Sequence, residues 1–349
     1  MKVISLFDGI SCGRVALERA NIQVEEYHAF EIDKYAIQVS QKNYPDIVRH
    51  GSVVEANFTQ LKGFDLLFGG SPCQDLSIAK KDRQGLDGAR SGLFWEYVRA
   101  LKEVNPKYFL FENVASMPKE AKAVISSKLG CEPILINSAL VSAQQRKRLY
   151  WTNIEGIEQP QDKGIFLRDI LESGVVDRDK SYTMKHQAGN ARDYFKKHHT
   201  QIVFEPIVTE EKSQSIKAQY GKNNVQNFVM RGSRHATGVF EPIRLGEIEN
   251  TAKDPKSQQY RVYSIKGKSI SLSGNGGGLG ANTGLYYIDL PDGDYIIRKL
   301  TPIECERLQT LPDNYTAGIS NTQRYKCCGN GWTIDVISHI LKKLTPNSN

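Results

Sequence analysis

Short apolar runs alternate with segments of helical apolar spacing through the first 164 residues of the chain. The apolar runs predict strands at Val3–Phe7, Glu26–Phe30, Leu66–Phe68, Phe109–Phe111 and Glu132–Ile136. The helical spacing predicts helices at Arg14–Ala20, Tyr35–Asn43 and Gly92–Val104. Strands separated by helices predict an α/β fold, in which a parallel sheet carries helices on both faces. Sheets of this kind bind ligands at the carboxyl ends of their strands.

The pattern changes near residue 165, where short strands, polar turns and glycine clusters replace the helical spacing. Helical spacing returns after Arg298: Thr301 is a good N-cap, Pro302 suits the first helical position, and Glu304 can complete a capping box. A last helix is predicted at Thr333–Leu344. We therefore expect an α/β domain made of residues 1–164 and 322–349. Residues 165–321 are expected to form a smaller β-rich domain with a hinge.

Positive charge is concentrated in the second of these segments. The chain of 349 residues has a formal net charge of +7. Between Lys180 and Lys268 there are 16 Lys and Arg against 8 Asp and Glu, which accounts for the whole surplus. A generic solvated surface would explain this composition. A surface that binds the phosphate backbone of a nucleic acid would explain it equally well.

The composition is that of an ordinary globular protein, with 40% hydrophobic and 24% charged residues. No apolar stretch reaches the roughly 18 residues that cross a bilayer. The apolar run at the N-terminus is too short for the core of a signal peptide. The six cysteines form no C-x-x-C pair and offer no zinc-ligand spacing. We therefore expect a cytoplasmic protein with reduced thiols, no membrane segment and no metal.

Two strand ends carry residues suited to a nucleoside-type ligand. The first predicted strand runs into a turn that contains Gly9 and Gly13, where the backbone can approach a ligand closely. The second strand runs into Glu31, about 20 residues further on, where a carboxylate can bind ribose hydroxyls. The spacing is G-x-x-x-G rather than the dinucleotide G-x-G-x-x-G. A merely tight turn between strand and helix would also explain it.

Cys73 follows the third predicted strand, behind a glycine pair and Pro72. A cysteine at this place projects into the ligand cleft, and nearby positive charge favours the thiolate. The polar loop that follows, Asp75–Ser91, is rich in glycine, lysine and arginine and could close over a substrate.

Acidic and basic residues follow the next two strands. Glu112 ends an apolar strand, a setting suited to proton transfer. Further along, Gln144–Arg148 carries two arginines whose guanidinium groups could hold Glu112 or a substrate anion. A surface salt-bridge network would explain each block taken alone. Together, they place a nucleophile, an acid and arginines at strand ends of one sheet.

These blocks, in this order, resemble those of the DNA cytosine-5 methyltransferases of bacterial or phage type, over nearly the whole chain. The blocks are Phe7–Gly13, Glu31, Gly70–Gln74, Glu112-Asn113-Val114, Gln144–Arg148, Arg298–Tyr315 and Gly329-Asn330-Gly331. The resemblance implies a Rossmann-like S-adenosylmethionine-dependent methyltransferase sheet with helices on both faces. It also implies that the basic β-rich segment is a target recognition domain.

The resemblance implies sequence-specific DNA methylation, as in restriction-modification systems. Cys73 would add to C6 of a flipped-out cytosine, and C5 would take the methyl group of S-adenosyl-L-methionine, giving 5-methylcytosine and S-adenosylhomocysteine. Glu112 would hold the base at N3. Arg146 and Arg148 would position Glu112 and the flipped nucleotide.

The resemblance also implies binding residues. Those for the cofactor are Phe7, Asp8, Gly9, Ile10, Gly13, Glu31, Ile32, Ser52, Pro72 and Asn330. Those for DNA are Gln74, Ser77, Lys81, Arg90, Ser271 and Leu272. The implied partner is double-stranded DNA, bound by a monomer, in a bacterial or phage-infected cell.

Two positions depart from the family pattern. Gly51-Ser52 stands where Gly-Asp is common, so a carboxylate for the adenine amino group is missing or supplied elsewhere. Ile32 replaces an aromatic residue that is often stacked on adenine. Both changes could weaken cofactor binding, and neither touches the methyl-transfer residues.

Three other functions compete with this interpretation. A tRNA cytosine-5 methyltransferase of the same superfamily would share the motifs, although a large basic insert argues against it. A catalytically idle DNA-binding homologue would not need all of Cys73, Glu112, Arg146 and Arg148. A nicotinamide dehydrogenase would explain the first glycine turn but would leave Pro72-Cys73 and the arginines without a role.

Overall fold

The computed structural model describes residues 1–71, 93–176, 179–181, 183, 202–206, 262–264, 285–287 and 295–345. By its internal contacts the chain divides into two compact units. The first consists of Met1–Ile170, Lys180–Ala188 and Thr301–Asn349, and the second of Leu171–Asp179 and Gly189–Leu300. Residues 301–321, which the sequence pattern assigned to the second domain and its hinge, thus pack within the first unit.

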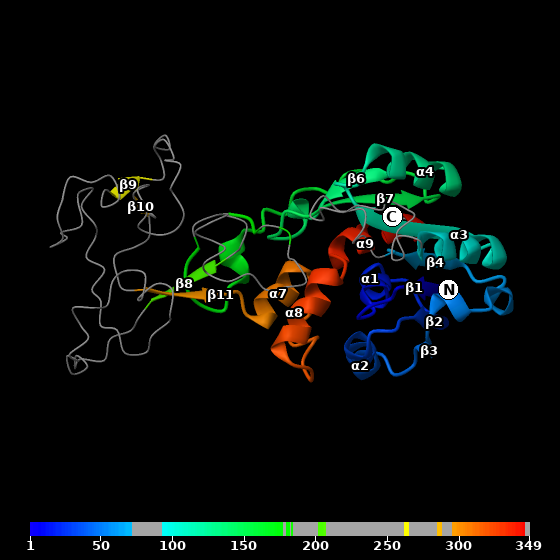
Figure 1. The fold of residues 1–349 in the computed structure, drawn as a ribbon, viewed down its shortest axis with the longest axis horizontal. Coiled ribbons are helices and arrows are strands. Elements are labelled where there is room, and N and C mark those ends of the chain that lie inside the picture. The colour runs from blue at the N-terminus through cyan, green and yellow to red at the C-terminus, as the bar shows by residue number, and fades with distance from the viewer. Residues whose placement is uncertain are drawn as a thin grey trace, which may run out of the picture. The chain divides into compact units, whose positions relative to one another are not determined.

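A seven-stranded sheet forms the centre of the first unit (Figure 1). Its strands are β1 (Lys2–Leu6), β2 (Glu26–Phe30), β3 (Val48–His50), β4 (Leu66–Gly69), β5 (Tyr108–Val114), β6 (Ile134–Asn137) and β7 (Lys147–Thr152). Their order across the sheet is β3-β2-β1-β4-β5-β7-β6. The first five strands in that order are parallel, whereas β7 runs antiparallel to both β5 and β6. The α/β class is confirmed, and the expectation of a wholly parallel sheet is wrong at β7.

Helices cover both faces of this sheet. The helices described in the first unit are α1 (Cys12–Arg19), α2 (Lys34–Asn43), α3 (Leu93–Val104), α4 (Lys119–Leu129), α7 (Pro302–Leu308), α8 (Asn321–Asn330) and α9 (Ile334–Leu341). Neighbouring β1 residues show how the faces divide, since Val3 packs in the core with α1 and α9 and Ile4 in the core with α3 and α4. Both side chains are fully buried, as the alternation of side chains along a strand requires.

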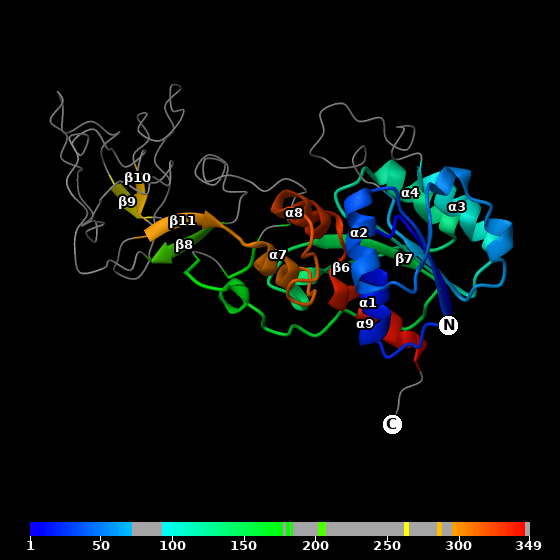
Figure 2. The same ribbon diagram turned by 90° about the horizontal axis from the view of Figure 1, so that it is seen from below.

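The C-terminal helices α8 and α9 pack beside the N-terminal helices of the same unit. In Figure 2, α8 and α9 lie beside α1 and α2, although nearly 300 residues separate them in sequence. Thr301 accepts a hydrogen bond from the Glu304 amide, and the Glu304 side chain accepts one from the Thr301 amide. This confirms the predicted capping box at the start of α7.

Two strand pairs are described in the second unit. Strands β8 (Ile202–Pro206) and β11 (Tyr295–Lys299) pair antiparallel, and β9 (Val262–Ser264) pairs with β10 (Leu285–Tyr287) in parallel. Among the described residues, no helix is long and apolar enough to cross a membrane. The same residues contain no cluster of three or more His, Cys, Asp or Glu that could hold a metal ion.

Candidate active site

The turn after β1 is held in an uncommon backbone conformation. Phe7, Gly9 and Ser11 all have positive φ angles, of 57°, 59° and 61°. For a residue with a side chain such a conformation costs about 1–3 kcal/mol. The buried carboxylate of Asp8 holds this turn, because it accepts hydrogen bonds from the Ser11 hydroxyl (2.6 Å) and the Tyr27 hydroxyl (2.7 Å). Burial raises the pKa of the Asp8 carboxyl. Asp8 therefore stabilises the conformation of the turn from the buried side.

Glu31 ties the ends of β1 and β2 together. Its Oε2 accepts a hydrogen bond from the Gly9 amide at 2.8 Å, and its Oε1 accepts from the Ile32 and Asp33 amides, each at 2.8 Å. Each carboxylate oxygen has about two acceptor sites, so the group can still receive a hydroxyl. Ile32 is 76% exposed, which is unusual for so large an apolar side chain beside a polar turn. Glu31 and Ile32 thus present a hydrogen-bond acceptor and an exposed apolar side chain at this strand end.

Ser52 has a local structural role. Its hydroxyl accepts a hydrogen bond from the Val54 amide (3.2 Å) and so caps the short 3₁₀ helix Val53–Glu55. The hydroxyl keeps further hydrogen-bonding capacity. The substitution of Asp by Ser at this position therefore keeps a capping residue and removes a negative charge.

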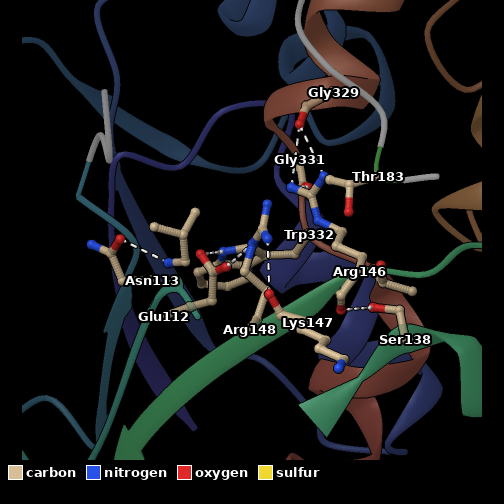
Figure 3. A network of polar contacts seen from close by, with 12 residues as sticks. Glu112, Asn113, Ser138, Arg146, Lys147, Arg148, Thr183, Gly329, Gly331 and Trp332 are labelled. Atoms are coloured by element: carbon tan, nitrogen blue, oxygen red, sulfur yellow. Dashed lines mark hydrogen bonds and ion pairs between the residues drawn. The ribbon is translucent and has the colours of Figure 1, made fainter. Parts of the chain in front are cut away.

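Glu112, on β5, lies between two donors from distant parts of the chain (Figure 3). Its Oε1 is 2.8 Å from Nε of Arg148, and its Oε2 accepts a hydrogen bond from the indole Nε1 of Trp332 at 3.1 Å. The side chains of Glu112 and Arg148 are only 11% and 13% exposed. Water screens an ion pair so largely buried only weakly, and the pair holds Oε1 of the carboxylate beside Arg148.

Gly70 leaves room for this arrangement. A Cβ atom at Gly70 would lie 2.9 Å from Oε2 of Glu112 and 3.3 Å from Nε1 of Trp332. Neither atom could keep its present place beside a methyl group at that distance. The glycine that follows β4 is thus required by the carboxylate on β5.

Asn113 connects the same strand end to the residue before Pro72-Cys73. Its Nδ2 lies 3.5 Å from both the carbonyl oxygen and the hydroxyl of Ser71, and its Oδ1 accepts from the Val114 amide at 2.8 Å. Asn113 and Ser71 are both buried. The Glu-Asn-Val block therefore supplies the carboxylate and also anchors the backbone that leads to the predicted nucleophile.

Arg146 holds the C-terminal end of α8. Its guanidinium donates to the carbonyl oxygens of Gly329 (3.2 Å) and Gly331 (3.0 Å), the two residues that flank Asn330 (Figure 3). The side chain is buried, at 4% exposure. Gln309 reinforces this end by donating to the carbonyl oxygens of Cys328 and Gly331. Asn330 itself is exposed, so its side chain is available to a ligand.

The structure thus brings together several predicted site residues from separate segments. The β1 turn and Glu31 form one group, and Glu112 with Arg148 forms another. Ile10 and Gly13 lie buried behind the turn, where a Cβ at Gly13 would meet the Phe68 ring at 2.4 Å. The remaining predicted residues lie outside the described part of the chain: Pro72, Cys73, Gln74, Ser77, Lys81, Arg90, Ser271 and Leu272.

Trp332 and Gln309 are site residues that the sequence interpretation missed. Trp332 directly follows Gly329-Asn330-Gly331, which was the available signal. Its contact with Glu112 spans 220 residues of sequence, so spacing gives no indication of it.

Comparisons with known proteins agree with this geometry. The family model described as "C-5 cytosine-specific DNA methylase" matches residues 1–346. The chain is 28% identical to the orphan methyltransferase M.SPRI of Bacillus phage SPR, over 99% of this chain and 97% of that protein. It is 26% identical to the type II methyltransferase M.HhaI of Haemophilus parahaemolyticus, over 100% of this chain and 95% of that protein.

Solved structures share the fold at low sequence identity. The methyltransferase EhMeth of Entamoeba histolytica superimposes with a TM-score of 0.59 at 16% identity, covering 99% of both chains. A mutant of Spodoptera frugiperda DNMT2 gives a TM-score of 0.55 at 17% identity, covering 98% of this chain and 99% of that one. The match of the family model over residues 1–346 decides the assignment: the chain belongs to the C-5 cytosine-specific DNA methylase family.

Proposed function

We propose that this chain methylates C5 of cytosine in double-stranded DNA, in a specific target sequence, and acts as a monomer with Cys73 as its nucleophile. The observation that carries the proposal is the Glu112 carboxylate, fixed by Arg148 and Trp332 at the strand end next to Ser71. Pro72 and Cys73 follow Ser71 directly. A carboxyl group and a thiol are the groups that cytosine C5 chemistry needs.

In the proposed reaction, the thiolate of Cys73 adds to C6 of the flipped cytosine. A proton shared between Glu112 and N3 of the base forms a hydrogen bond and stabilises the charge that develops in the ring, so that C5 becomes nucleophilic. Arg148 keeps the carboxyl group in place. When bound, S-adenosylmethionine would supply the methyl group that C5 takes and would be released as S-adenosylhomocysteine. Loss of the C5 proton then expels the thiolate and restores the enzyme.

The residues of the β1 turn and the β2 end fit S-adenosylmethionine. Glu31 keeps acceptor capacity for ribose hydroxyls, and Ile32 exposes an apolar face to the adenine. Asn330 is exposed at the end of α8, between two residues whose carbonyl oxygens Arg146 holds, and would also contact the cofactor. In this proposal Arg146 acts by placing the Gly329–Gly331 segment.

We assign target recognition to the second unit, which contains the basic segment from Lys180 to Lys268 except for Lys180–Ala188. Lysine and arginine contacts to phosphates release counterions, so affinity for DNA falls steeply with salt. Replacing basic residues of this segment by glutamine should weaken DNA binding and flatten its salt dependence. Binding of S-adenosylmethionine should not change.

The test is transfer of a labelled methyl group from S-adenosylmethionine to duplex DNA or to tRNA, with bisulfite sequencing of DNA from expressing cells. We expect transfer to duplex DNA and a consistent sequence around each methylated cytosine. Cys73→Ser should abolish transfer while S-adenosylmethionine still binds. Near-normal turnover by Cys73→Ser, or transfer to tRNA alone, would contradict the proposal.

A further inference from the structure

We infer that Trp332 is a positioning residue for the reaction, and that it acts by orienting the Glu112 carboxyl group. The inference rests on the proposed function, because it concerns how the proposed acid is held. Trp332 lies outside the Gly-Asn-Gly motif proper, and its indole belongs to the segment that follows α8. The same short segment thus serves two parts of the site, Asn330 for the cofactor and Trp332 for the acid.

The geometry around Glu112 explains why one donor would be insufficient. Arg148 engages Oε1 alone, through Nε, and its Nη1 donates to the carbonyl oxygen of Lys147. With only this contact, the carboxyl group could still rotate about its last bond. The indole N–H on Oε2 removes that freedom. The base therefore meets a group whose plane is already set, which lowers the entropy cost of reaching the reactive geometry.

The indole is itself held firmly. Its ring packs edge-on against Phe68, a fully buried residue of β4, with the ring centroids 5.7 Å apart and the planes at 83°. A Cβ atom at Gly70 would lie 3.3 Å from Nε1, so little space is left beside the indole. The backbone before Trp332 is fixed at the Gly331 carbonyl by Arg146 and Gln309. A donor supported in this way is a precise positioning device rather than an incidental surface contact.

The decisive variant is Trp332→Phe, which removes the N–H and keeps an aromatic ring against Phe68. We expect kcat for methyl transfer to fall about tenfold to a hundredfold, since a hydrogen bond to a charged group is lost. The KM values for S-adenosylmethionine and DNA should change less than about twofold, because the lost interaction acts on a reacting group. Calorimetric titration should show unchanged S-adenosylmethionine binding.

Trp151→Phe is the matched control. Trp151 is fully buried on β7, and its indole N–H donates to the Ser126 hydroxyl at 3.0 Å, away from Glu112. Trp151→Phe removes the same indole N–H as Trp332→Phe does, and it also breaks a hydrogen bond. Its kcat should equal that of the wild type when both are assayed well below their unfolding temperatures.

A double-mutant cycle separates positioning from a general structural effect. Glu112→Asp keeps a carboxyl group but withdraws it by one methylene from the indole. In that background, adding Trp332→Phe should change the single-turnover rate by less than about twofold. Equal losses in both backgrounds would overturn the inference, as would an unchanged kcat in Trp332→Phe or a loss confined to the KM for S-adenosylmethionine. A wild-type protein that transfers no methyl group would instead overturn the proposed function, and the inference with it.

Discussion

Glu112 and Arg148 form their 2.8 Å ion pair diagonally across two antiparallel strands. Arg148 stands opposite Val114 in the register, two residues beyond Glu112, so the two side chains project from the same face. Reversal of β7 places its first residues at the edge where the parallel strands end. An arginine at the start of one strand can therefore hold an acid at the end of its neighbour.

Arg148→Lys tests this relationship. The ammonium keeps the charge but cannot reproduce the contact of a guanidinium Nε. We expect a fall in kcat of about tenfold or more, with S-adenosylmethionine affinity unchanged. Steady-state methyl transfer and calorimetry would measure both. Full activity in Arg148→Lys would show that charge alone at this place is enough.

Gly70→Ala should damage the site by a steric clash alone. The added methyl would lie 2.9 Å from Oε2 of Glu112 and would displace the carboxylate. Methylation should fall strongly, by about a hundredfold if the acid loses its position. Gly51→Ala is the control, because nothing lies within 4 Å of a Cβ at that position. Comparable losses in the two variants, measured by methyl transfer, would contradict the steric account.

Gln144, the first residue of the Q-x-R-x-R block, has an unusual environment. It is fully buried, and both polar atoms of its amide lack a hydrogen-bond partner in the described structure. Such a group costs about 1–3 kcal/mol. Gln144→Leu should therefore raise the free energy of unfolding by roughly that amount, measured by urea denaturation.

Gln309→Leu is the control for Gln144→Leu, and the opposite effect on stability is expected. Gln309 is equally buried, but its amide donates to the carbonyl oxygens of Cys328 and Gly331 and accepts from the Thr333 hydroxyl. This substitution should lower the free energy of unfolding. If both leucine variants shift it in the same direction, hydrogen bonding is not the deciding difference between the two glutamines.

Thiol alkylation should distinguish Cys73 from the buried cysteines. Burial raises the pKa of the Cys12 and Cys327 thiols to about 12 each. At pH 8, only about one in ten thousand of these thiols is ionised, and the thiolate is the reactive form. Iodoacetamide should thus label Cys73 first in the native protein, with peptide mapping as the readout. Raising the pH should increase thiolate, and therefore labelling, at Cys12 and Cys327. Prompt labelling of Cys12 at pH 8 would argue against its burial.

The sequence was informative where local pattern decides structure. The strand predicted at Glu26–Phe30 and the capping box at Thr301 are both confirmed. In both cases, neighbouring residues supply the determining interactions. Strand β3, with three residues, is too short to be recognised by periodicity. Helix α8 was missed because its polar sequence has few apolar positions to reveal a buried face.

The direction of β7 could not be read from the chain in the same way. The connection between β6 and β7 is short and contains only the 3₁₀ turn Ser138–Leu140, so the chain reverses there without a crossover helix. For the site, strand ends predicted the neighbourhood of Glu112 and the arginines. The strand ends did not predict that the two arginines have different partners. Arg148 holds Glu112, whereas Arg146 holds the carbonyl oxygens beside Asn330. Such pairings depend on side-chain direction, which spacing does not encode.

The return of the chain to its first unit has a consequence for synthesis on the ribosome. The apolar face of α1 packs with Ile337 and Ile340 of α9, which are made long after α1 itself. Until those residues emerge, the nascent chain carries an uncovered core behind the site. Chains interrupted before the final helix should therefore be both aggregation-prone and inactive, so that a partly made methyltransferase cannot modify DNA.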